Sequence, residues 1–233
     1  MNGHVSDAEQ LAMLGAMQLA DGALPIGRFA HSSGLERWLH LNPNASPAEL
    51  KAVVSATLTL SVAPLDGAAL CEAHRTFELD ELLQLDSLLT AQKSAAASRA
   101  ASQSCGRQLA KLAWRLSEDR LLNEYCALVN NRESPGNLAI TEGVIARALN
   151  VSETLAALIS LRGAAAAMLS SAVRLGRLSP SLCQQLLAEL GPTIVNASAT
   201  ARETPTDRWH STAPDIEICL LGSGRGEMRF FAS

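Results

Sequence analysis

The strongest constraint on the fold of this chain is an apolar content made almost entirely of aliphatic residues. Apolar residues make up 48% of the sequence but aromatic residues only 3%. Alanine and leucine favour helices, whereas β-branched and aromatic side chains favour strands. From about residue 8 to residue 202 the apolar residues recur at three-to-four spacing, and nothing alternates with period two long enough to predict a strand. The sequence therefore predicts an all-α chain.

Proline, glycine and capping residues divide this region into about ten helices. The segments that we predict to be helical are 8–20, 31–41, 47–62, 65–76, 79–89, 91–116, 138–150, 154–175, 180–190 and 192–202. We expect Ser46 to cap one helix and Pro64 to end it. A chain of 233 residues favours one domain with a sizeable core. We predict a flexible N-terminus (1–7), a helical domain (8–203) and a C-terminal tail (204–233).

The predicted tail differs in composition from the rest of the chain. It is rich in glycine and proline and closes on Arg229, Phe230 and Phe231. A glycine-rich stretch has high conformational entropy and does not fold by itself. Two adjacent aromatics in a chain so poor in them suggest an anchor. We expect the tail to be extended and to become ordered on a partner, with docking on its own core as the alternative.

Charge and cysteine content exclude several classes of protein. Lys and Arg number 19 against 23 Asp and Glu, which argues against a general nucleic-acid binder. Charged residues are only 18% of the chain, so part of the surface is expected to be neutral or covered by another protein. The five cysteines contain no C-x-x-C pair, which favours free thiols in a reducing compartment. We find no signal peptide and no apolar run of membrane-spanning length, and we expect a cytoplasmic protein.

Motifs that carry chemistry are scarce. The chain has no G-x-x-x-x-G-K-[ST] phosphate loop, no G-x-S-x-G elbow and no H-E-x-x-H pair. Cys71 and His74 are spaced to share a helix face, but two ligands do not close a metal site. We therefore predict no catalytic residues, no metal site and no cofactor.

The segment from residue 18 to residue 36 is the most distinctive part of the chain. An apolar turn leads to a helix start that carries Phe29, His31, Ser32 and Glu36. Hydrogen-bond donors at a helix N-terminus could hold an anionic or carbonyl group of a partner. One alternative is a capped helix whose Phe29 packs inside. Another is a stand-alone enzyme with a pocket around His31, Ser32 and Glu36.

This segment resembles the urease accessory protein UreF family, whose pattern here is Q-L-A-x-x-A-L-P-x-G-x-F, an aromatic residue or His, then Ser and G-L-E. The matching positions are Gln18 to Ala20, Ala23 to Pro25, Gly27, Phe29, Ser32 and Gly34 to Glu36. Looser similarity continues through residues 91–112 and 171–194. The ending Arg229-x-Phe231-x-Ser233 resembles the family's R-L-F-x-S, so the resemblance covers nearly the whole chain.

The resemblance implies an all-helical, non-catalytic assembly factor that forms a homodimer. Family members bind the scaffold protein UreD (also called UreH), recruit the GTPase UreG and deliver nickel to apo-urease, and are proposed to couple GTP hydrolysis to metal insertion. On this basis the candidate partner-binding residues are Phe29, His31, Ser32, Glu36, Arg229, Phe230 and Phe231. A generic helical scaffold unrelated to urease is a further alternative.

The chain departs from the family pattern at three places. Ser223-Gly224 stands where many members have His-Glu, and Ala232 replaces a basic residue. Arg28 replaces a glycine that is common at that place in the connector. Contacts made by the replaced side chains are therefore in question for this chain.

Overall fold

The computed structural model describes residues 6–222, and every regular element in that range is a helix. This confirms the all-α prediction. The elements in chain order are α1 (Asp7–Ala20), η1 (Arg28–Ala30), α2 (Leu35–Leu41), α3 (Pro47–Thr57), the π-helix η2 (Leu58–Gly67), α4 (Ala68–Arg75), α5 (Leu79–Gln92), α6 (Ala96–Ala113), α7 (Arg120–Asn130), α8 (Leu138–Ala148), α9 (Glu153–Arg174), α10 (Pro180–Glu189), α11 (Gly191–Glu203), η3 (Thr206–Arg208) and α12 (Pro214–Gly222).

Helix starts follow from local capping chemistry. The Ser46 hydroxyl accepts from the backbone N–H of Glu49, and Glu49 in turn accepts from the Ser46 backbone at 2.8 Å. Such a reciprocal capping box satisfies two of the N–H groups that a helix start leaves open. Ser6 and Glu9 form the same arrangement at α1. The predicted cap at Ser46 is confirmed.

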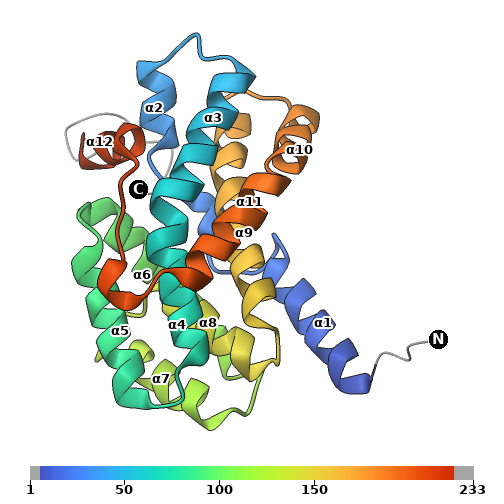
Figure 1. Ribbon diagram of the computed structural model, residues 1–233, viewed down its shortest axis with the longest axis vertical. Helices are drawn as coiled ribbons and strands as arrows, with labels where there is room; N and C mark the ends of the chain where they lie inside the picture. Colours follow the sequence, from blue (N-terminus) through green and yellow to red (C-terminus); the bar gives the residue numbers. More distant parts are fainter. Residues whose placement is uncertain (1–5, 223–233) are drawn as a thin grey trace.

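The hydrophobic core surrounds α8 and α9. Leu161 and Met168 of α9 are almost fully buried, as are Ile140 and Ile145 of α8. Helix α9 runs through the middle of the molecule, from the end that holds α2, α3 and α10 to the end that holds α5, α7 and α8 (Figure 1). Because α9 contacts helices of both ends, residues from all parts of the described chain join one core.

Residues 96–106 of the small-residue segment 94–106 form part of α6, which packs tightly against its neighbours. A side chain added at Gly106 would collide with the backbone at Gly136 and Asn137. A side chain at Gly143 of α8 would meet the Leu70 carbonyl of α4 in the same way. Glycine is therefore needed where these backbones approach most closely. The prediction of a helix, rather than a flexible linker, is confirmed here.

The prediction that Pro64 ends a helix is wrong. Helices α3 and α4 are continuous through the π-helix η2, with Pro64 in its interior. Proline has no N–H and therefore donates no hydrogen bond within the helix. The Leu60 carbonyl accepts from the backbone N–H of Thr212 at 2.8 Å, and the Pro64 carbonyl accepts from the backbone N–H of His210 at 3.3 Å. A segment distant in the sequence therefore adds hydrogen bonds to the helix around this proline.

This continuous helix bears on the expectation that no segment could span a membrane. Within the described part of the chain, Pro47–Arg75 and Glu153–Arg174 have the length and mean hydropathy of membrane-spanning helices. Their most apolar windows are 61% and 50% buried inside the fold. Both pass through the protein core, and core helices share this composition, so the two segments are weak evidence for a membrane.

The expected tail begins later than the sequence suggests. Residues 204–222 pack on the body, where Trp209, Ile216 and Cys219 are buried and Pro214–Gly222 forms α12. Five of the six residues in 216–221 are hydrophobic, and they supply the apolar area that holds this segment on the body, although the tail as a whole is rich in glycine and proline. The description as an extended tail is thus corrected for 204–222. Residues 223–233 lie outside the described range.

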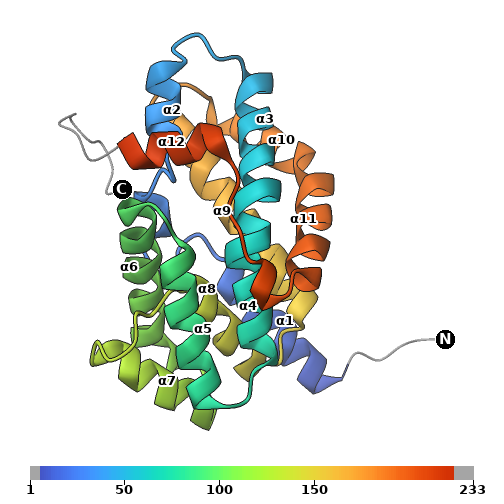
Figure 2. The same cartoon turned by 60° about the vertical axis from the view of Figure 1, so that its left-hand side comes forward.

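Helix α1 is present as predicted, but it faces the solvent more than its spacing suggested. Only Gly15 and Ala16 are buried, whereas Leu11 and Leu14 point outward. The helix projects from one side of the body (Figure 2). Its apolar residues therefore form an outer surface and contribute little to the core.

Candidate functional site

The connector between α1 and α2 carries most of the sequence-predicted site. Gly27 and Gly34 both have left-handed backbone angles, with φ of 78° and 85°. These two positions turn the chain before and after the short helix η1 and allow it to pack on α9. Gly34 also lies against Ile216 and Leu220 of α12, where a larger residue would crowd both side chains. The connector is thus held between α9 and α12.

The predicted site residues of the connector have different surroundings. Phe29 is half-buried beside Gly22, and Glu36 is half-buried in the first turn of α2. His31 is half-buried and lines a cavity, whereas Ser32 is buried and neither Ser32 nor Glu36 is among the cavity's lining residues. The structure therefore does not assemble the pocket that the enzyme alternative needs. Ser32 also presents almost no surface to a partner.

The predicted tail anchors fall outside the described residues. Arg229, Phe230, Phe231, Ser223 and Gly224 belong to the segment 223–233. Their roles remain predictions from the resemblance. What the structure adds is that the helix α12 comes directly before them in the chain.

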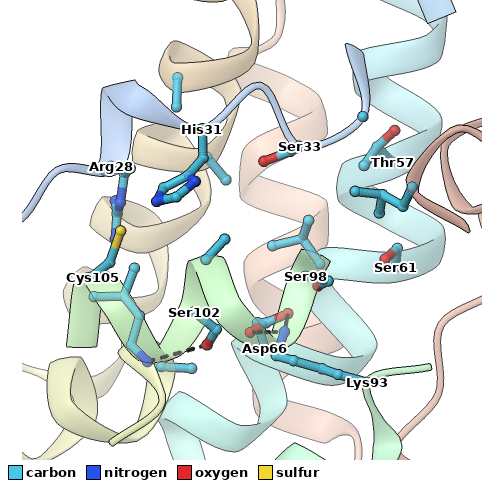
Figure 3. Close-up of a pocket in the computed structure, with 18 of the residues that line it drawn as sticks. Arg28, His31, Ser33, Thr57, Ser61, Asp66, Lys93, Ser98, Ser102 and Cys105 are labelled. Carbon is cyan, nitrogen blue, oxygen red and sulfur yellow. Dashed lines mark hydrogen bonds and ion pairs between the residues drawn. The ribbon is translucent and has the colours of Figure 1, made fainter. Parts of the chain in front are cut away.

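A cavity of about 170 Å³ lies behind the connector (Figure 3). Its walls come from the connector, η2, α6, α8, α9 and α12. Ile216 and Leu220 of α12 supply part of the apolar lining, and Ser98 and Ser102 of α6 part of the polar lining. The cavity is thus lined by elements from both ends of the sequence, with α12 as one wall.

Two ion pairs line this cavity. Arg28 pairs with Glu142, and both side chains are more than four-fifths buried. The second carboxylate oxygen of Glu142 accepts from Ser160 at 2.7 Å, and the guanidinium lies over Gly163, where a side chain would displace it. The arginine that departs from the family pattern therefore ties the connector to both α8 and α9.

The second ion pair joins η2 to Lys93, the residue that caps the C-terminal end of α5. Lys93 Nζ lies 2.6 and 2.7 Å from the two carboxylate oxygens of Asp66. The lysine side chain is only 5% exposed. A charge this deeply buried is tolerated because both oxygens of its partner accept from it. The two pairs balance in charge, so the cavity has no net charge from these four groups.

Neither ion pair was anticipated from the sequence. Each joins residues far apart in the chain, so no local spacing brings them together. The available signal was Arg28 itself, a charged residue in an otherwise apolar turn.

Metal-binding groups do not converge in the described part of the chain. Within residues 6–222 no group of three or more His, Cys, Asp or Glu side chains is arranged to hold a metal ion. Cys71 is buried, and His74 Nε2 lies 2.8 Å from the carbonyl of Val151. Cys71 and His74 therefore have the surroundings of residues that support the fold.

All five cysteines are free and buried, and burial raises their pKa values. The pKa rises from the ordinary 9.0 to about 12 for Cys71 and Cys126, and to about 11 for Cys105. Burial is the largest cause in each case, because it disfavours the thiolate. The native thiols should therefore be unreactive at neutral pH, since the thiolate is the nucleophile.

These pKa shifts predict alkaline destabilisation. A raised pKa in the folded state means that folding favours the protonated thiol, and this stabilisation is complete below the unfolded pKa of roughly 8.5. It should be lost as the pH rises from there toward 12, the folded value of Cys71 and Cys126. Urea unfolding measured from pH 7 to pH 11 should show falling stability, and Cys126→Ala should fall less steeply. Equal slopes for both proteins would contradict the assignment.

Two exposed apolar surfaces lie outside the cavity. The α1 surface consists of Leu11, Met13, Leu14 and Met17, which are 51–68% exposed. The α12 surface consists of Ile218 and Leu221, which are 64% and 62% exposed. Helices α1 and α12 lie on opposite sides of the body in both views (Figures 1 and 2). Clustered exposed apolar side chains of this size mark interaction sites more often than isolated ones do.

Comparison with known proteins gives consistent matches along the chain. The family model described as UreF matches residues 45–191. The chain is 27% identical to urease accessory protein UreF of Bacillus sp. (strain TB-90) over 95% of this chain and 99% of that protein. It is 28% identical to UreF of Corynebacterium efficiens over 94% and 96% of the two chains. It is also 28% identical to UreF 2 of Brucella canis over 94% and 91%.

Proposed function

We propose that this chain bridges two other maturation proteins during urease assembly. The premise is that the chain belongs to the UreF family of urease accessory proteins. The proposed partners are the scaffold UreD (UreH) and the GTPase UreG. The assembled complex would act on apo-urease, with nickel as its cargo. The chain would contribute binding surfaces and no reaction centre, and it could influence GTP hydrolysis by UreG only through contact.

The observation that carries this proposal is the pair of apolar surfaces on α1 and α12 (Figure 1). An assembly protein that binds several molecules at once needs more than one surface, and these two lie on opposite sides of one core. Both surfaces consist of Leu, Ile and Met at positions where their neighbours in the same helix already pack on the core. A protein without partners would gain solubility from polar residues at these positions.

The scaffold is proposed to bind over α12 and the segment that follows it. Burying Ile218 and Leu221 offers on the order of 3–6 kcal/mol before ordering costs are subtracted. Fixing the backbone of each following residue costs roughly 1–2 kcal/mol. The apolar contacts of α12 would therefore help to offset the ordering of a tail that carries Phe230 and Phe231. The bound tail, together with Arg229, would then form part of the surface for the GTPase.

The connector is proposed to support these contacts from beneath α12. Gly34 packs on Ile216 and Leu220, and Arg37 donates to the carbonyl of Gly222 at 2.8 Å. Phe29, His31 and Glu36 are partly exposed in this region and are proposed as further partner contacts. A substitution in the connector would thus disturb the C-terminal end of α12, where the tail begins.

A cytoplasmic location is part of the proposal. Its support is chemical, because the five cysteines are free although each is buried in a well-packed helical protein. Free thiols persist in reducing compartments.

The proposal can be tested by complementation in a urease-positive cell that lacks its own UreF. Expression of the full chain should restore nickel-dependent urease activity, whereas a truncation after residue 213, which removes α12 and all that follows, should not. Both proteins must accumulate to equal levels. A generic scaffold would restore nothing, and full restoration by the truncated chain would remove α12 and the tail from the function.

A further inference from the structure

The outer face of α6 carries a row of basic side chains. Between Asp86 and Glu118 the sequence has five Lys and Arg residues and no Asp or Glu, in a chain whose formal net charge is −4. Three of the five, Arg107, Lys111 and Arg115, follow one another at steps of four along α6 and the turn after it. At this spacing opposite charges attract and like charges repel, so a solvated helix face usually mixes both signs. The row is therefore unusual for a surface that meets only water.

None of the three charges is neutralised by an ion pair within the part of the chain that the structure describes. Arg107 donates to two neutral groups, the side-chain oxygen of Gln103 at 2.8 Å and the carbonyl of Pro135 at 3.3 Å. Lys111 and Arg115 are exposed, and no carboxylate in residues 6–222 lies within ion-pair distance of either. The row thus presents positive charge that is available to a partner.

Trp114 lies within this row and is 54% exposed, although only 3% of the residues in the chain are aromatic. Arg115 Cζ lies 5.0 Å from the centroid of the Trp114 ring, which is a cation–π contact. The contact restrains the guanidinium, so less conformational freedom is lost when the guanidinium pairs with a carboxylate. Trp114 and Arg115 therefore form a partly preorganised binding element.

The helix dipole explains only part of this pattern. The partial negative charge at a helix C-terminus stabilises a basic residue in the last turn, and this accounts for Lys111. It does not account for Arg107, which lies one turn earlier, or for an exposed tryptophan between basic residues. Tryptophan and arginine are the side chains that most often carry binding energy at protein interfaces. The combination is therefore typical of an interaction surface.

The basic row is separate from the α1 and α12 surfaces. Helix α6 lies on the side of the body away from α1 in both views (Figures 1 and 2). Helix α12 contacts α6, and the α6 residues that line the cavity beside α12 lie between Ala97 and Cys105, before the row begins. A partner on the row would therefore leave both other surfaces open.

We infer that Arg107, Lys111, Trp114 and Arg115, the α6 surface, dock an acidic segment of a protein partner. Four residues of helix rise about 6 Å, so the basic groups repeat at about that distance. Carboxylates four residues apart on a helix have the same repeat, and those two residues apart on a strand repeat at about 6.6 Å. The segment carries acidic side chains at one of these spacings and an apolar side chain that covers Trp114. The inference goes beyond the proposed function, which assigns no role to α6.

Two other classes of anionic partner fit the α6 surface less well. The formal net charge of −4 opposes binding of a long nucleic acid, which would extend beyond the row. A membrane favours a broad apolar face beside the basic residues, whereas Trp114 is the one large apolar side chain that α6 exposes. A short acidic segment needs only the few side chains that the row offers.

Fluorescence anisotropy with a short labelled helical peptide, which carries Glu at positions i, i+4 and i+8 and a central Leu, tests the α6 surface. The wild type should bind this peptide, and added NaCl should weaken the binding. Lys111→Glu combined with Arg115→Glu should weaken it at least about a hundredfold, because two attractions become repulsions. Trp114→Ala should weaken it about tenfold.

Arg162→Glu combined with Arg208→Glu is the matched control. It makes the same change in net charge at two exposed arginines outside α6, and affinity should stay within about threefold of the wild type. Equal loss in this control would show that net charge alone attracts the peptide, and would overturn the inference. Failure of the wild type to bind the peptide would also overturn it.

Two further probes separate the classes of partner. A single-stranded oligonucleotide and vesicles that contain phosphatidylserine should bind the wild type more weakly than the peptide does. Binding of either probe as tightly as the peptide, with loss in the Lys111→Glu and Arg115→Glu double variant, would overturn the assignment to an acidic protein segment.

The same double variant tests the α6 surface in cells in which the wild type restores urease activity. The variant should restore less activity. If it still forms a complex with UreD and UreG, the acidic segment belongs to another protein of the assembly, and if that complex is lost, the segment belongs to UreD or UreG. Full activity together with an intact complex would overturn the inference and leave the proposed function unaffected.

Discussion

Replacing Asp86 with alanine is expected to destabilise this protein by about 3–5 kcal/mol, the largest single-site effect on stability that we predict. The Asp86 carboxylate is fully buried and accepts from Tyr125 Oη at 3.0 Å, Ser134 Oγ at 2.6 Å and the backbone N–H groups of Gly136 and Asn137 at 2.7 and 2.9 Å. It also accepts from Asn137 Nδ2 at 2.7 Å. Removing the carboxylate would leave these donors buried without an acceptor.

The measurement is the urea midpoint followed by helical circular dichroism. Asp86→Asn should retain part of the lost stability, because its amide oxygen still accepts. Asp80→Ala, on the same helix but exposed, should cost less than about 1 kcal/mol. An Asp86→Ala variant within 1 kcal/mol of the wild type would show that the loop 131–137 does not depend on this carboxylate.

Replacing Ile218 and Leu221 together with aspartate should weaken capture of the scaffold protein at least about a hundredfold. The two side chains are the exposed apolar part of α12, and central apolar residues carry most of the affinity of an interface. Their exposure means that the free protein should fold normally. Affinity measured by calorimetry or surface plasmon resonance gives the result.

Val195→Asp is the matched control, because Val195 is similarly exposed on a helix outside the α12 surface. It should bind the scaffold as the wild type does. Unchanged affinity of the double aspartate variant would place the scaffold elsewhere on the chain, whereas equal loss in the control would indicate a general effect of added charge.

Most of the helices could be predicted from the sequence because their signals are local, and α7 and α12 are the exceptions. Ser46, followed three residues later by Glu49, is sufficient to place the start of α3. The alternation of leucines and polar residues over 79–89 likewise predicts α5. Such features depend on residues within one or two turns, and a single sequence contains all of them.

The errors arise where a distant segment changes the outcome. A proline at position 64 predicts the end of a helix, but the helix continues, and the backbone N–H of Thr212 donates to the carbonyl of Leu60. Nothing near Pro64 in the sequence indicates that residues 209–213 pass beside it. The same contacts explain why α12 lies on the body, since Ser211 Oγ lies 2.7 Å from Ser61 Oγ. The continuation of the helix through Pro64 and the packing of residues 204–222 on the body therefore share one set of contacts.

The candidate site was predictable only in part. The connector was found because its residues are adjacent in the sequence, but its attachment through Glu142 and Ser160 needs the packing of α8 on α9. The exposure of Leu11 and Leu14 could not be predicted, because apolar residues at helical spacing look the same whether they face a core or a partner. Asp86 did leave a signal, since it occupies the same face as Leu82 and Leu89.

The central claim is that this protein works by being bound on more than one surface at once. The most direct measurement is light scattering on a mixture of this chain with UreD and UreG. We expect one species that contains all three proteins and two copies of this chain, and no stable association of UreD with UreG when this chain is left out. Co-elution of UreD and UreG without it, or its elution apart from both, would contradict the account.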